Sequence, residues 1–169
     1  MNENEILQKL ILVCNTKADA VKRVRILKEF LENKFFKNKS LNLEKFLKSL
    51  KASEYDIEAM KQLPAQFYAS FNKNNAYPII RKISKALDKL ETIHLYVPVE
   101  LTEGELFKIG SWFKQNVAKN TLLEIDTDKN LTLGCALSRN GVYRDFSLKY
   151  FLQGKRPEIN KILDNYVKT

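Results

Sequence analysis

Apolar residues recur at three- and four-residue spacing along almost every segment between residues 5 and 90. This spacing places them on one side of a helix. Glycine is absent from this part of the chain, and its only prolines are Pro64 and Pro78, which favours helices joined by short polar turns. The apolar stripes cover residues 6–14, 21–35, 43–50, 57–63, 67–71 and 79–90. Short helices of this kind are not stable alone in water, so we expect them to pack against one another.

The pattern changes after residue 92. Residues 93–99 are β-branched and aromatic enough for a strand. Thr102 and Glu105 have the spacing of a capping box, and we expect the helix that they open to bury an apolar stripe. The stripe consists of Leu106, Ile109, Trp112, Phe113 and Val117.

Residues 122–125 predict a second strand and residues 131–137 a third. Asn140-Gly141 predicts a tight hairpin turn from the third strand into residues 142–143, and Gly134 predicts a bulge or a close backbone approach. A short helix is expected from Leu148 to its end at Gly154, and another from Pro157 onward. Together these patterns predict an α+β protein, with an all-α helical bundle over residues 1–90 and a small mixed α/β domain with a β-hairpin over residues 91–169.

Composition narrows the function classes. The chain has 169 residues and no apolar run long enough to span a bilayer, and its start lacks the positive region of a secretory signal, so we expect no transmembrane segment. Residues 1–90 carry 18 basic and 10 acidic residues, a net charge of +8, whereas residues 91–169 carry 11 and 10, a net charge of +1. Such a charge could favour nucleic acid, an anionic surface or an acidic protein. Basic residues such as Lys22, Arg23 and Lys28, interspersed with Glu29 and Glu32, are also typical of solvated helix faces, which is the interpretation we favour.

Candidate chemistry is sparse. Cys14 and Cys135 have no neighbour at metal-ligand spacing and are expected to be small buried side chains. His94 has no evident catalytic partner and is expected to be structural or exposed. Glu124, Asp126 and Asp128 could be imagined as a metal or acid–base site, but the adjacent turn favours solvent exposure. We therefore expect no catalytic, cofactor-binding or metal-binding residues.

The order of elements from Ile93 to Leu152 resembles the C-terminal domain of the delta subunit of F-type ATP synthases, the oligomycin-sensitivity-conferring protein family. That family shows an Asp-Pro-Ser-Leu-Ile-Gly-Gly-Val turn into a hairpin that is closed by Asp-x-Ser-hydrophobic. Lys129 stands where the family has Pro, and Leu133 stands at its first Gly. The matching positions, which we expect to be structural, are Asp128, Leu131, Gly134, Asp145, Ser147 and Leu148. The resemblance covers roughly the last 75 residues, and the helical first half agrees with the family's N-terminal bundle.

The resemblance implies a non-catalytic stator subunit at the cytoplasmic face of the membrane. Its bundle would dock on the N-terminal segments of the alpha subunits, and its second domain would hold the b-subunit stalk. The candidate stalk-binding residues are Phe151, Leu152, Ile159, Ile162, Leu163 and Tyr166. Three alternatives remain open from the sequence: a basic nucleic-acid-binding protein, a small hydrolase or transferase, and a free-standing adaptor that binds another helical partner.

Overall fold

The computed structural model describes residues 1–37 and 42–167, with side chains described up to residue 165. The chain is α+β, which confirms the predicted class. It divides into two compact units, one formed by residues 1–92 with 102–123 and the other by residues 93–101 with the described residues from 124 onward. None of the described helices has the length and apolar character needed to cross a bilayer.

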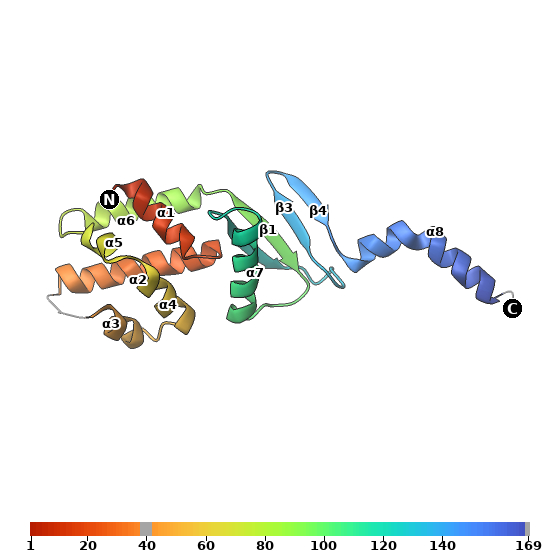
Figure 1. Cartoon of the computed structure of the whole chain (residues 1–169), viewed down its shortest axis with the longest axis horizontal. Coiled ribbons are helices and arrows are strands. Elements are labelled where there is room, and N and C mark those ends of the chain that lie inside the picture. The colour runs from red at the N-terminus through yellow and green to blue at the C-terminus, as the bar shows by residue number, and fades with distance from the viewer. Residues whose placement is uncertain (38–41, 168–169) are drawn as a thin grey trace. The chain divides into compact units, whose positions relative to one another are not determined.

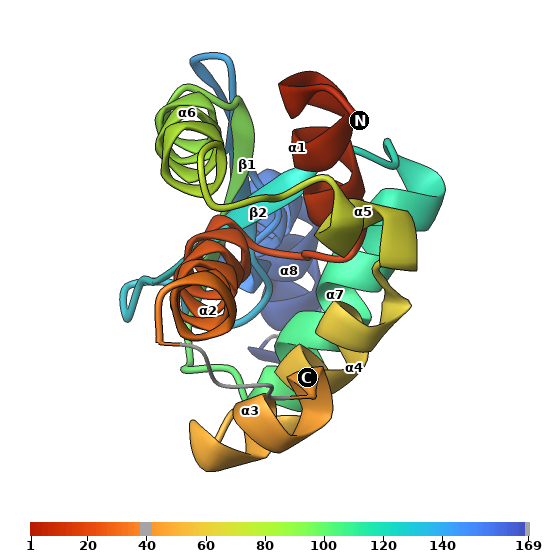
Figure 2. The same cartoon turned by 90° about the vertical axis from the view of Figure 1, so that its left-hand side faces the viewer.

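The first unit is helical, and each of the six segments predicted there overlaps a helix. Figure 2 looks onto these helices, with the long helix α2 beside α6. They are α1 (Glu3–Leu12), α2 (Lys17–Phe35), α3 (Leu43–Ser49), α4 (Glu54–Gln62), α5 (Ala65–Ala69) and α6 (Ala76–Asp88). Their apolar stripes meet in one core, whose largest fully buried members include Ile6, Leu10, Leu27, Leu47, Met60, Phe67 and Ile83.

The predicted caps form as expected. The Ser53 side chain accepts a hydrogen bond from the backbone N–H of Asp56 at the start of α4. Thr102 and Glu105 form a capping box that opens α7 (Glu103–Asn116). Each cap satisfies backbone donors that the first turn of a helix leaves without partners.

Helix α7 belongs to the first unit, whereas the predicted boundary after residue 90 placed it with the second. It packs against the turn between α1 and α2, where the Asn15 side chain donates to the carbonyl oxygen of Phe107 at 3.3 Å. The stripe on α7 was predicted only in part. Phe113 is buried, but Trp112 is 56% exposed and Val117 is also exposed, because one narrow edge of α7, centred on Gly110 and Phe113, meets the unit.

Most residues of the sheet shown in Figure 1 belong to the second unit. The strands of the sheet are β1 (Thr92–Val97), β2 (Leu122–Thr127), β3 (Ala136–Arg139) and β4 (Val142–Asp145), in the order β2-β1-β3-β4. β3 pairs antiparallel with both β1 and β4. The Asn140-Gly141 turn is confirmed, since Arg139 pairs with Val142 and both turn residues have positive φ, 51° and 77°.

The third strand is shorter than predicted, beginning at Ala136 instead of residue 131. Residues 131–135 form irregular backbone because Gly134 has a φ of +90° and turns the chain out of a strand conformation. A Cβ at this position would lie 2.4 Å from the carbonyl oxygen of Phe146, so the predicted close backbone approach is present.

A single helix, α8 (Leu148–Val167), replaces the two short helices predicted at the end of the chain. Gly154 lowers helix stability without stopping a helix. Pro157 lies inside α8 and leaves the carbonyl of Gln153 without its usual donor, which solvent can replace because Gln153 is exposed.

Candidate functional site

The second unit exposes a row of large apolar side chains along α8. Phe151 is 61% exposed and Leu163 56%, and only Ile159 is partly covered. We call this row the α8 face and define it by Leu148, Phe151, Leu152, Ile159, Ile162 and Leu163. Successive helix residues turn by about 100°, which places these six within about a third of the helix circumference. A contiguous exposed apolar surface of this kind marks a binding site more often than a free surface.

The structure thus places five of the six predicted partner-binding residues on one exposed face. The sixth, Tyr166, lies on α8 in the same register, and its side chain is outside the described part of the structure. None of the five is a core residue, because the described part of the second unit places no element over them.

The start of α8 is held by the residues that carry the family resemblance. Asp145 Oδ1 accepts from the backbone N–H of Ser147 at 2.7 Å, and Ser147 Oγ accepts from that of Tyr150 at 3.2 Å. The backbone N–H of Leu148 donates to the carbonyl of Leu133 at 2.9 Å, beside Gly134. These three hydrogen bonds hold the first turn of α8, and the bond to Leu133 attaches it to the loop before β3.

Asp128 and Leu131 form the turn that leads into this loop. Asp128 Oδ1 accepts from the backbone N–H of Asn130 at 2.9 Å, and the N–H of Leu131 donates to the carbonyl of Asp128 at 3.1 Å. Leu131 is buried. All six resemblance positions therefore have structural contacts around the base of α8 or the turn before it.

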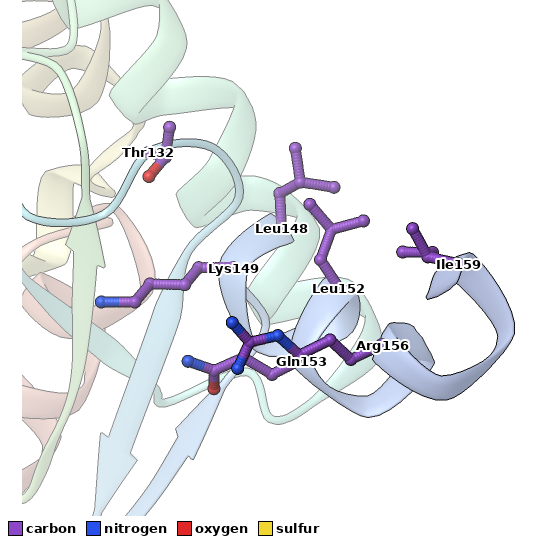
Figure 3. A pocket seen from close by; sticks show the side chains of 7 residues that line it. All are labelled: Thr132, Leu148, Lys149, Leu152, Gln153, Arg156 and Ile159. Atoms are coloured by element: carbon purple, nitrogen blue, oxygen red, sulfur yellow. The ribbon is translucent and has the colours of Figure 1, made fainter. Parts of the chain in front are cut away.

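A pocket of about 410 Å³ lies against the first half of α8. Figure 3 shows its apolar wall along one edge of the helix, made by Leu148, Leu152 and Ile159. The polar ends of Lys149 and Arg156, with Gln153 and Thr132, complete the lining. The sequence pattern indicated the apolar residues but gave no indication of the pocket, because its shape depends on the irregular loop that contains Thr132.

The first unit has a smaller exposed apolar site that the sequence did not indicate. Phe36 and Tyr77 lie at the ends of α2 and α6, both are exposed, and their ring centroids are 5.3 Å apart. Phe36 follows the predicted stripe of residues 21–35 and Tyr77 precedes that of residues 79–90, so both side chains fall outside the predicted stripes.

His94 has a partner that the sequence did not reveal. Its Nε2 lies 3.0 Å from Glu124 Oε2, and its Nδ1 lies 3.9 Å from Asp126 Oδ2. The two carboxylates lie two residues apart on β2, the strand beside β1, and so share one face of the sheet. The Asp126 side chain is 60% exposed. Within residues 1–37 and 42–167, no three His, Cys, Asp or Glu side chains are grouped to hold a metal ion.

Cys14 is fully buried, as predicted, whereas Cys135 is only partly buried. Burial raises the pKa of the Cys14 thiol to about 11, which keeps it protonated near neutral pH. A protonated, inaccessible thiol is a poor nucleophile or metal ligand.

Two of the basic residues interpreted as a solvated face have structural partners instead. Arg23 is buried, and its Nε donates to Asp56 Oδ1 at 3.1 Å. Lys22 Nζ lies 2.6 Å from the other carboxylate oxygen, and Arg23 also donates to the carbonyl of Val13. The solvated-face interpretation was therefore wrong for Arg23, because its guanidinium serves a buried carboxylate that lies 33 residues away in the sequence.

Lys114, on helix α7, forms hydrogen bonds with the backbone at the end of α1. Its ammonium donates to the carbonyls of Ile11 and Leu12 at 2.6 and 2.8 Å. Burial lowers the pKa of Lys114 from 10.5 to about 8, because desolvation disfavours the charged form.

Replacing Lys114 with Met should make the free energy of unfolding depend less on pH in the alkaline range. The folded wild type binds fewer protons than the unfolded chain between about pH 8 and pH 10.5, so its free energy of unfolding should rise relative to that of Lys114→Met across this window. Urea unfolding of both proteins at pH 7, 8, 9 and 10 measures this difference. Parallel curves over the whole range would contradict the lowered pKa.

The chain matches no protein-family model and no curated protein.

Proposed function

We propose that the chain is a non-catalytic stator subunit of an F-type ATP synthase, of the delta or oligomycin-sensitivity-conferring type. The observation that supports this most is the α8 face, which exposes the predicted stalk-binding residues on a helix anchored by the resemblance positions. In this proposal, the second unit binds the end of the b-subunit stalk.

The task of a stator is to hold the catalytic hexamer still against rotor torque, so it needs affinity and stiffness but no reactive group. Fully burying a Leu, Ile or Phe side chain contributes about 1.5–3 kcal/mol. Association costs on the order of 4–15 kcal/mol in lost freedom of motion. Burying the six residues of the α8 face would supply a free energy comparable to this cost. A partner helix that lies along α8 could bury most of them at once.

The first unit would dock on the N-terminal segments of the alpha subunits. The exposed pair of Phe36 and Tyr77 is a candidate contact for such a segment, because adjacent exposed aromatic rings present a large apolar area and aromatic side chains often anchor interfaces. The subunit would then be peripheral to the membrane, on its cytoplasmic face.

A free-standing adaptor for another helical protein is the second candidate, and it is favoured by the same exposed α8 face. Nucleic-acid binding gains less support. The buried Arg23 and its neighbour Lys22 are engaged by Asp56, which removes two cations from the basic surface of the first unit.

We expect a tagged full-length chain to retain alpha, beta and b subunits from native membranes solubilised in mild detergent. Because α8 is exposed, Leu152→Glu with Ile162→Glu should preserve the fold and reduce recovery of b subunits at least tenfold. Mass spectrometry of the retained proteins measures this recovery, and circular dichroism checks the fold.

The matched control is Tyr150→Glu. Tyr150 is as exposed as Phe151 but lies on the opposite side of α8, so this variant should retain the b subunits. Absence of every ATP synthase subunit from the wild-type eluate would reject the stator proposal and leave the adaptor.

A further inference from the structure

Helix α8 has the residue spacing of a coiled-coil seam. Five of the six seam positions are apolar and alternate at four- and three-residue intervals, and Lys155 takes the remaining one. The apolar five are Leu148, Leu152, Ile159, Ile162 and Tyr166. A seam of this spacing is complementary to a second helix lying nearly parallel to the first.

Lys155 does not prevent such packing. Its ammonium lies 2.9 Å from Glu158 Oε1, at the edge of the helix, so its charge is already compensated within α8. The long methylene stem of a paired lysine can lie along apolar surface while its head stays at the edge.

Two further cations flank the seam on one side. Lys149 and Arg156 are seven residues apart, both directly follow a seam position, and both line the pocket with Leu152 (Figure 3). Neither forms an ion pair with another residue in the described part of the chain. Positions beside a coiled-coil seam usually meet the partner's charged residues and determine which partner binds.

A second copy of this chain does not supply the missing charges. In an antiparallel pair of α8 helices, the positions of Lys149 and Arg156 would face the same positions of the other copy, which places like charges together. In a parallel pair, Arg156 would face Phe151 of the other copy. Self-association therefore offers these cations no acidic partner from the other copy in either orientation.

We propose that the α8 face binds a partner helix that has apolar residues at coiled-coil spacing and acidic residues at the positions that meet Lys149 and Arg156. This inference rests on the proposed docking function of the second unit and specifies the charge of its partner. The cations lie along one flank, and Glu158 lies on the other. This one-sided arrangement suits a helix with an acidic edge better than an anionic lipid surface, which would attract cations on both flanks.

The test uses the full-length chain and three synthetic helices of three heptads each. All three carry Leu and Ile at the seam positions, and the positions beside the seam are Glu in one, Gln in the second and Lys in the third. Fluorescence anisotropy of labelled peptide measures affinity at low and high salt. We expect the Glu peptide to bind at least tenfold more tightly than the Gln peptide, the Lys peptide to bind most weakly, and salt to reduce these differences.

Lys149→Glu with Arg156→Glu should reverse the order, so that the Lys peptide binds best. The matched control is Lys161→Glu, which lies away from the seam on α8 and should leave the order unchanged. Equal affinity for the three peptides, or binding to none of them, would overturn the inference. Binding to phosphatidylserine vesicles in place of the peptides would overturn it in favour of a membrane surface.

These outcomes are separate from those of the stator proposal. Recovery of ATP synthase subunits without a charge-dependent peptide order would reject only the acidic-helix inference. A charge-dependent order without recovery of those subunits would reject only the stator proposal.

Discussion

Asp56→Asn should lower the free energy of unfolding by about 3–5 kcal/mol, because it leaves the buried Arg23 guanidinium without a counter-ion. Asp56 is only 2% exposed and receives Arg23 Nε at 3.1 Å and Lys22 Nζ at 2.6 Å. Asn keeps the size and one acceptor oxygen of the side chain, so the loss measures the missing charge more than a cavity. Urea unfolding followed by circular dichroism gives the value.

The matched control is Glu44→Gln, which makes the same carboxylate-to-amide change on the surface. Glu44 lies 3.1 Å from Lys48 and 3.3 Å from Lys61, but all three side chains are well exposed. Exposed ion pairs contribute little because water solvates and screens both charges. We therefore expect a clearly smaller effect, and equal losses in the two variants would show that Asp56 acts as an ordinary surface carboxylate.

Most helices and strands could be predicted from the sequence because each depends on local periodicity and local caps. The stripes of the first unit, the capping box at Thr102 and the Asn140-Gly141 turn each involve residues within a few positions of one another. Interactions over this range leave a direct trace in the sequence.

The errors arose where a distant contact decides the structure. Trp112 fits the stripe of α7, yet only the edge around Gly110 meets the unit. Arg23 resembles its exposed neighbours in sequence, and its buried partner Asp56 lies on another helix. Residues 131–135 alternate like a strand, but Gly134 turns the backbone to approach Phe146.

The sequence predicted the apolar residues of the candidate site but not that they lie on one continuous helix. Periodicity identified the apolar positions from Phe151 to Leu163, but Gly154 and Pro157 were taken to divide them between two helices. The structure joins them in one helix, and only a continuous α8 gives the single seam with Lys149 and Arg156 along one flank. Gly and Pro make a helix end more probable at their position but do not require one. In α8 the helix continues because solvent can satisfy the exposed backbone carbonyl that Pro157 leaves unpaired.

Gly110→Ala should destabilise the protein, although Gly-to-Ala changes inside helices usually stabilise them. A Cβ at Gly110 would lie 2.3 Å from Asn15 Cβ and 2.8 Å from Asn15 Cγ, closer than nonbonded carbon atoms can approach. Asn15 cannot move freely, because its backbone carbonyl accepts from Leu123 and its side chain donates to Phe107. Helix α7 would have to shift away from the turn before α2, at a cost of about 1–3 kcal/mol.

Gly154→Ala is the matched control, since Gly154 also lies inside a helix but has open space around its Cβ position. It should gain up to about 1 kcal/mol from the higher helix propensity of Ala. Thermal unfolding of both variants beside the wild type tests the opposite signs of the two changes. A gain at Gly110 similar to that at Gly154 would mean that α7 does not approach Asn15 closely. The packing of α7 against the first unit would then lack its closest contact. The hydrogen bonds from Lys114 to the carbonyls at the end of α1 would also be in question, because they depend on the same close approach of α7.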